Sequence, residues 1–200
     1  MGSRIMHLII AKQIAEQFSI QDKNAFLLGG IAPDAVSPKE KSHYFEGDTE
    51  RYTRTIAYEK FIHNYHQKSD YVLGYYTHLI ADYVWLKGFY LGWLKNRMNA
   101  DNNLYEKYHQ DFRLLNGKLL HHYQISKDIL ENVNFNTIHD LDEVKVRDVV
   151  GFVPYVKGDF NYKKETLNDS LQVFSFQQII GYLETSIEIG LMRMKEAGIT

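Results

Sequence analysis

The sequence contains no cysteine. This absence excludes both a disulfide framework and a thiolate metal site, so any bound metal must be held by His, Asp, Glu or main-chain groups. An excess of charge of one sign is missing too, because 23 basic residues stand against 25 acidic ones and the formal net charge is −2. Without a long block of Lys and Arg, tight non-specific binding to nucleic acid is not expected.

Long apolar runs are also absent. No segment reaches the roughly 18 consecutive apolar residues that a transmembrane helix needs. Near the N-terminus, the apolar window 6–10 is interrupted by His7 and is too short for the hydrophobic region of a secretory signal. We therefore expect a cytoplasmic protein without a transmembrane segment.

What the sequence does contain is helical periodicity. Two hundred residues suit one domain of ordinary size. Apolar side chains recur every three or four residues, as in helices, in five long segments, which are 3–18, 52–67, 70–94, 103–122 and 175–196. Another helix is expected over residues 22–31, where Asp22 is a candidate N-cap.

Residues 134–174 are less regular, because they contain Gly151, Pro154 and Gly158. Short helices and loops are expected there. No alternating pattern of strands is visible, so we predict an all-α, single-domain helical bundle over residues 1–200, with no sheet beyond a stray hairpin.

One helical segment carries an ionisable pair on an apolar face. In "YYTHLIADYVW", residues 75–85, His78 and Asp82 are four residues apart, so they share a helix face with Tyr71 and Trp85. A hydrogen bond between the two side chains, buried in an ordinary core, is one interpretation. Because an isolated buried charge is costly, metal coordination is the other.

Three more candidate ligands lie elsewhere in the chain. His7 is on the apolar stripe of segment 3–18, Asp34 follows a proline in the first loop, and His43 lies in the same loop. Together with His78 and Asp82 they match the mixed nitrogen and oxygen ligands of Zn²⁺ and similar divalent ions. A carboxylate can also bridge two ions, as in dinuclear centres that cleave phosphoesters.

Four short segments, in this order, resemble the zinc-dependent phospholipase C family, a relative of the S1/P1-type nucleases. They are "MHLIIAKQI", "GGIAPDA", "KSHYF" and "LGYYTHLIAD", and the resemblance covers about the first 120 residues. It implies a predominantly helical fold with metal ions in a cleft between helices.

The resemblance also implies a set of ligands. Asp34, His43, His78 and Asp82 would bind one divalent ion, and Asp82 would bridge to a second ion held partly by His7. The ion would be Zn²⁺, with Mn²⁺ or Fe²⁺ as alternatives. We further expect Asp34 to orient or deprotonate the attacking water if it is not itself a ligand.

The chain departs from the family at the positions of a third metal. Gly88 stands where the family has a histidine six residues after the bridging aspartate. Arg113 stands where a glutamate follows His109 by four residues. A three-metal site is therefore not expected. His109 and Asp111 are possible additional cleft residues, although a spacing of two places them on different helix faces.

The resulting hypothesis is metal-dependent hydrolysis of a phosphoester, most simply a phosphodiester, with a small phosphoester or a phospholipid headgroup as substrate. One alternative is a non-catalytic relative that keeps a structural or sensing metal site. Another is nuclease-like activity on single strands, which would need base-stacking aromatic side chains beside the metals. The His-Asp dipeptide in "IHDLD", residues 138–142, lacks the spacing of HD-type phosphohydrolases.

Overall fold

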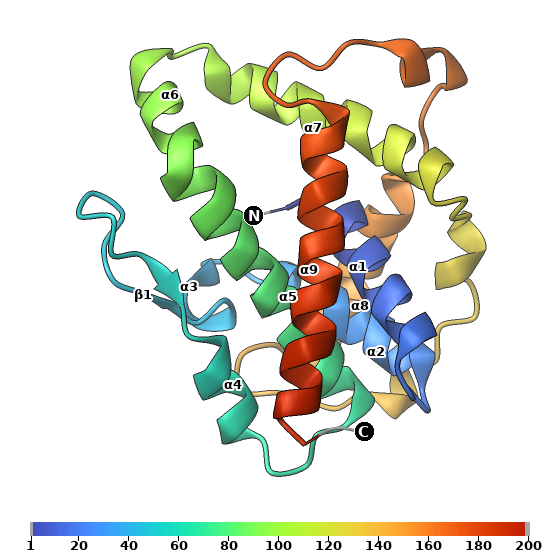
Figure 1. Cartoon of the computed structure of the whole chain (residues 1–200). Coiled ribbons are helices and arrows are strands. Elements are labelled where there is room, and N and C mark those ends of the chain that lie inside the picture. The colour runs from blue at the N-terminus through green and yellow to red at the C-terminus, as the bar shows by residue number, and fades with distance from the viewer. Residues whose placement is uncertain (1, 199–200) are drawn as a thin grey trace.

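The computed structural model describes residues 2–198, and nearly all of the regular structure in them is helical (Figure 1). This confirms the predicted all-α class. The α-helices are α1 (Arg4–Gln17), α2 (Lys23–Ile31), α3 (Lys39–Ser42), α4 (Tyr58–Asn64), α5 (Asp70–Trp85), α6 (Lys95–Ala100), α7 (Leu104–His122), α8 (Val146–Gly158) and α9 (Phe176–Glu196). Shorter or wider helical turns are η1 (Ala32–Ala35), η2 (Leu86–Leu94), η3 (Lys127–Leu130), η4 (Phe135–Thr137) and η5 (Lys164–Asn168).

Polar side chains mark where the long helices begin. The carboxylate of Asp22 accepts a hydrogen bond from the amide of Ala25 at 2.9 Å, so the predicted N-cap of α2 is confirmed. Ser3, Ser69 and Ser175 cap α1, α5 and α9 in the same way. Each cap satisfies an amide that has no partner inside its helix, which fixes the residue at which the helix starts.

Glycines bring α2 and α5 into backbone contact. A Cβ atom on Gly74 would lie 2.0 Å from the carbonyl oxygen of Phe26, and one on Gly29 would lie 2.1 Å from that of Tyr71. Any larger residue at either position would collide with main-chain atoms, which cannot move aside as a side-chain tip can. Helices α2 and α5 are therefore packed as closely as their backbones allow.

The C-terminal helix closes the bundle. In Figure 1, α9 runs in front of α5 and α1, and it contacts both of them. Its buried side chains Ile179, Leu183 and Ile187 recur every four residues and face the same core as Trp85 of α5. The segment 175–196, whose periodicity is helical, thus forms a helix at nearly the expected bounds.

Two segments differ from the sequence-based prediction. Residues 52–67 are helical only in α4, because β2 (Thr55–Ile56) pairs antiparallel with β1 (Phe45–Glu46) in a small hairpin. Residues 146–158 form the full helix α8, where only short elements were expected. Pro154 is tolerated there because it lies on the exposed face, while Val149 and Val153 anchor the opposite face in the core.

The predicted helix over 70–94 changes character after Trp85. Residues Leu86–Leu94 form the wide π-helical turn η2 before α6 resumes the α-helix. Wide turns of this kind are rare and are often found beside functional sites. The π-helical turn begins at Leu86, four residues after Asp82.

Candidate metal centre

The five proposed ligands come from separate parts of the chain and meet in one place. His7 is on α1, Asp34 on η1, His43 directly after α3, and His78 and Asp82 on α5. The side chains of His7, His43, His78 and Asp82 are fully buried, and that of Asp34 is 7% exposed. The close packing of α1, α2 and α5 brings these residues together although up to 75 positions separate them in the sequence.

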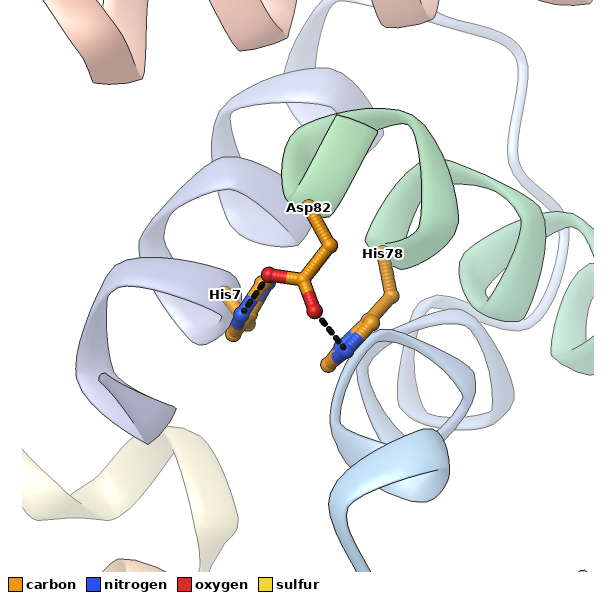
Figure 2. Close-up of side chains that lie close together, drawn as sticks. All are labelled: His7, His78 and Asp82. Carbon is orange, nitrogen blue, oxygen red and sulfur yellow. Dashed lines mark ion pairs between the residues drawn. The ribbon is translucent and has the colours of Figure 1, made fainter. Parts of the chain in front are cut away.

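The two oxygens of Asp82 face different partners. Oδ1 lies 3.3 Å from Nε2 of His7 and accepts a hydrogen bond from the amide of Gly2 at 3.3 Å. Oδ2 lies 3.3 Å from Nε2 of His43 and 3.7 Å from Nε2 of His78. Figure 2 shows the carboxylate directed between the rings of His7 and His78. A carboxylate with one oxygen toward each group has the arrangement needed to bridge two ions.

His43, His78 and Asp34 form the other side of the cluster. Nε2 of His43 lies 3.4 Å from Oδ1 of Asp34 and 3.4 Å from Nε2 of His78. The ring of His7 stacks on that of His78, with centroids 3.7 Å apart. Five groups that can each offer a lone pair are thus within contact distance of one or more of the others.

Groups outside the cluster fix the tautomer of two of the imidazoles. Nδ1 of His78 lies 2.8 Å from the carbonyl oxygen of Gly30, which can only accept, so this nitrogen carries the hydrogen. Nδ1 of His43 lies 2.9 Å from Oγ of Ser42, whose own hydrogen goes to the carbonyl oxygen of Pro33 at 3.0 Å. Whenever these rings are neutral, both Nε2 atoms present lone pairs to the centre of the cluster.

The electrostatics follow from this arrangement. Burial by itself would raise the pKa of Asp82, but nearby positive charge, together with hydrogen bonds from the imidazoles, holds it well below its ordinary value. Asp34 shows the same balance, since His43, His78 and Lys39 lower its pKa against the effect of burial. Both carboxylates are therefore ionised inside a buried cluster.

The pKa values of His43 and His78 are shifted in opposite directions. Burial tends to lower the pKa of His43, yet hydrogen bonds with Asp34 and Asp82 raise it above its usual value. Burial and the nearby His7 lower the pKa of His78 to about 3. The same two carboxylates therefore favour the charged form of His43, while burial favours the neutral form of His78.

The donor set fits a divalent metal ion. His7, His78 and Asp82 form one group of possible ligands, and Asp34, His43 and His78 form a second, each with its ligand atoms within 4.8 Å of one another. Two ligand atoms at the usual zinc distances of about 2.0–2.2 Å are separated by about 3.4 Å in a tetrahedral site. The observed 3.3–3.7 Å separations between nitrogen and oxygen atoms match this value.

Two buried polar groups beside Asp82 lack hydrogen bonds. Within residues 2–198, neither ring nitrogen of His7 has a hydrogen-bond partner, although Nε2 is near Asp82, and the same is true of the hydroxyl of Tyr182. A Cβ atom on Gly2 would lie 3.2 Å from Nε2 of His7 and 3.1 Å from Oη of Tyr182. Nε2 of His7 and the hydroxyl of Tyr182 thus both lie beside the main chain of Gly2, where even a methyl side chain would be in tight contact with them.

Of the two possible additional cleft residues, His109 lines a cavity and Asp111 does not. His109 lines a cavity of about 350 Å³ together with Asp34. Asp111 faces away from it and is fully buried, where its carboxylate accepts hydrogen bonds from the amides of Gln172, Val173 and Phe174 at 2.7–3.1 Å. Asp111 thus holds the loop before α9, in agreement with the different helix faces expected from the spacing.

The structure also shows where Gly88 and Arg113, the residues that depart from the family pattern, and the segment "IHDLD" lie. Gly88 is an exposed residue of η2 with open space where a Cβ atom would be. Arg113 lines the cavity beside His109. Of the "IHDLD" segment, His139 and Asp140 are exposed, and Asp140 accepts a hydrogen bond from the amide of Val146 at the start of α8.

Several residues at the site were not identified from the sequence. Ser42, the carbonyl of Gly30 and the hydroxyl of Tyr182 contact the cluster or surround it. The carbonyl of Gly30 leaves no sequence signal, since every residue has one. The position of Ser42 next to His43 is the one signal that could have been used, because a hydroxyl can fix a neighbouring imidazole.

Comparison with known families agrees with this geometry. The family described as zinc dependent phospholipase C matches residues 6–174, which include all five proposed ligands. The chain therefore belongs to the zinc dependent phospholipase C family. The match extends about 50 residues beyond the first 120, to which the sequence resemblance was limited. No curated protein and no solved structure gives a significant match.

The helices of residues 2–198 also bear on membrane topology. None of them combines the length and the apolar character that crossing a bilayer requires.

Proposed function

We propose that this chain is a metal-dependent phosphoester hydrolase that acts on a phosphodiester with two divalent ions. The observation that carries the proposal is the carboxylate of Asp82, whose two oxygens face two different groups of buried ligands. Zn²⁺ suits this mixed imidazole and carboxylate set, and Mn²⁺ or Fe²⁺ would also be accommodated. We take the whole chain as one domain, because α1, α5, α7 and α8 all contribute to the site or to the cavity beside it.

When bound, divalent ions in such a centre act as Lewis acids on phosphoryl oxygens and acidify water. In this proposal Asp82 bridges the two positions, His7 belongs to one of them, and Asp34, His43 and His78 belong to the other. The carbonyl of Gly30 and the hydroxyl of Ser42 keep His78 and His43 oriented with Nε2 inward.

If Asp34 is not itself a ligand, its position gives it another role in this proposal. Of the five proposed ligands, it alone lines the cavity of about 350 Å³, so it stands between the buried cluster and the space open to a substrate. Its low pKa keeps it ionised at neutral pH, which suits it to accept a hydrogen bond from the attacking water and to orient it. Lys39 forms an ion pair with Asp34 and limits how far the carboxylate can turn.

The test is hydrolysis of bis(4-nitrophenyl) phosphate by Zn²⁺- or Mn²⁺-loaded protein. We expect release of nitrophenolate by the wild type and by Asp128→Asn, a matched substitution at an exposed position away from the site. Asp34→Asn should lose most of this activity. If the loaded wild type binds metal but releases no nitrophenolate from this or other activated phosphoesters, the centre is structural or sensory and the proposal of catalysis is wrong.

A further inference from the structure

The cavity beside Asp34 has an uneven charge balance. Its lining includes three cationic side chains, Arg4, Lys39 and Arg113, and two carboxylates, Asp34 and Asp159. Arg4 binds Asp159 through two hydrogen bonds, with Nε to Oδ2 at 2.6 Å and Nη2 to Oδ1 at 2.9 Å, and Lys39 pairs with Asp34. Arg113 forms neither an ion pair nor a hydrogen bond with any of residues 2–198. One exposed guanidinium on the wall of the cavity thus has no partner in the part of the chain that the structure describes.

Arg113 is part of a polar row on α7. His109, Arg113 and Asn116 follow one another at spacings of four and three residues, so they lie on one face of the helix, and all three line the cavity. Asn116 is 9% exposed, and its Oδ1 atom is buried without a hydrogen-bond partner. A buried amide oxygen of this kind costs free energy unless a donor reaches it, and a rotation of the amide that exchanges its oxygen and nitrogen would turn Oδ1 toward the cavity, where a ligand hydroxyl is such a donor.

The aromatic residues of the cavity do not suit a cationic headgroup. A quaternary ammonium is held by open aromatic faces. The guanidinium of Arg4 already lies over the ring of Phe152, at 5.7 Å from its centroid. The ring of Phe112 packs against those of Tyr108, Trp85 and Phe174, with centroids 4.4–6.0 Å away. Neither phenyl ring offers the cage that choline recognition needs.

We propose that this cavity binds the alcohol portion of the substrate, and that this portion is a phosphorylated polyol. Arg113 binds its phosphate group, with the two-pronged geometry that guanidinium groups form with phosphate oxygens, and Asn116 accepts a hydrogen bond from one of its hydroxyl groups. The assignment rests on the phosphodiesterase function proposed above, since Asp34 connects the cavity to the metal centre. It narrows the substrate to an ester with a second anionic group, and it excludes choline esters.

Calorimetric titration with glycerol 3-phosphate tests the assignment without relying on turnover. It is carried out on the full chain, both Zn²⁺-loaded and treated with chelator, so that binding to the metal ions is separated from binding to the cavity. Arg113→Gln and Asn116→Ala are compared with Arg147→Gln, a change at an exposed arginine that does not line the cavity. We expect Arg113→Gln to weaken binding about tenfold or more in both forms, Asn116→Ala to weaken it less, and Arg147→Gln to leave it unchanged.

Equal affinities in Arg113→Gln and Arg147→Gln would overturn the assignment, and so would tighter wild-type binding of phosphocholine than of glycerol 3-phosphate. Hydrolysis of nitrophenyl esters without Arg113-dependent binding would overturn this inference and leave the proposed function standing. Arg113-dependent binding without hydrolysis would keep the binding site and refute the catalysis.

The phosphorylated polyol can be free in solution or part of a lipid. Sedimentation with phosphatidylcholine vesicles, with and without phosphatidylinositol 4-phosphate, distinguishes these sources. Arg113-dependent sedimentation only with the phosphoinositide supports a lipid headgroup. Binding of glycerol 3-phosphate alone supports a soluble ester.

Discussion

At the scale of single residues, two of the proposed ligands, His43 and His78, are oriented by groups that would not themselves touch the metal. Ser42 and the carbonyl of Gly30 hold the Nδ1 atoms of His43 and His78, so both Nε2 atoms point at each other across 3.4 Å. Two neutral imidazoles would repel in this arrangement, since neither Nε2 atom carries a hydrogen. A cation between them, either a proton or a metal ion, removes the repulsion.

Removing the hydroxyl of Ser42 should therefore weaken metal binding without unfolding the protein. In Ser42→Ala, Nδ1 of His43 loses its acceptor, and the ring is no longer fixed with Nε2 inward. We expect the affinity for Zn²⁺, measured by competition with a chromophoric chelator, to fall about 10- to 100-fold. Ser175→Ala is the control, because it removes the N-cap of α9 and should cost about 1 kcal/mol of stability with no change in zinc affinity. Equal zinc affinities in the two variants would rule out a role for Ser42.

The variant Asp82→Asn distinguishes two interpretations of this residue, a carboxylate that bridges two metal ions and a hydrogen-bonded side chain of an ordinary core. The change removes the charge that faces both ligand groups while nearly preserving volume, so metal content should drop by about one ion per chain. Phosphodiester turnover should fall by several orders of magnitude, and the fold should survive. In an ordinary core, the same change would cost about 1–3 kcal/mol through mismatched hydrogen bonds, with no metal to lose. Unchanged metal content together with a lowered melting temperature would support the core pair.

The candidate ligands could be predicted from the sequence because imidazoles and carboxylates are conspicuous on apolar faces. His78 and Asp82 are the clearest case, since their spacing on a helix places them on one face. The residues that orient them could not be predicted. The contact between His78 and the carbonyl of Gly30 spans 48 positions and depends on how closely two helices pack, which side-chain identity alone does not specify.

At the scale of helices, the packing of α2 against α5 positions the centre. A Cβ atom on Gly74 would overlap the carbonyl of Phe26, and the same close approach places the carbonyl of Gly30 within 2.8 Å of His78. The glycines therefore serve the site although none of their atoms is among the proposed side-chain ligands.

Gly74→Ala should weaken both stability and metal binding. The added methyl group forces α2 and α5 apart, which we expect to lower the free energy of unfolding by about 2 kcal/mol or more and to shift His78 from Gly30. Gly151→Ala on α8 is the matched control, because its Cβ atom would meet open space and helix propensity favours alanine by about 0.5–1 kcal/mol. Thermal melting and zinc titration of both variants provide the comparison. A Gly74→Ala protein as stable as wild type, with the same zinc affinity, would contradict this account of the packing.

The boundaries of several helices could be predicted, and the reasons for the failures are local. The cap at Asp22 is a short-range interaction that the sequence displays directly. In α8, by contrast, Pro154 predicts an interruption of the helix, but buried valines on the opposite face hold the helix in place. The hairpin of β1 and β2 contains two residues in each strand, too few for an alternating pattern to be recognised.

At the scale of the whole molecule, the cluster links folding to the binding of cations. Folding buries the carboxylates of Asp34 and Asp82, whose pKa values are lowered by the positive charges and the histidines around them. This contribution to stability is present above the ordinary carboxyl range and is lost as the pH falls through the lowered pKa values. A bound divalent ion should add to the stability of the folded state alone, because the ligands are far apart in the unfolded chain.

The gain in melting temperature on adding Zn²⁺ should therefore depend on pH. In the metal-free protein the pKa of His43 is raised, so its proton is bound below that raised value and must leave before Nε2 can coordinate. The stabilisation by the proton on His43 is lost as the pH rises through this pKa, whereas the stabilisation by zinc increases over the same range. We expect the difference between zinc-loaded and chelated protein to shrink as the pH falls from about 8 toward 5. A difference that does not change with pH would exclude His43 as a ligand.

The most direct test of the central claim is the metal content of protein purified without chelator, measured by elemental mass spectrometry beside His78→Ala. We predict about two divalent ions per chain in the wild type, because one oxygen of Asp82 faces His7 and the other faces His43 and His78. The His78→Ala protein should lose most of this metal, since His78 belongs to both groups of possible ligands. A wild-type chain that carries no more metal than His78→Ala, and that melts at the same temperature with and without chelator, would contradict the assignment of this cluster as a metal centre.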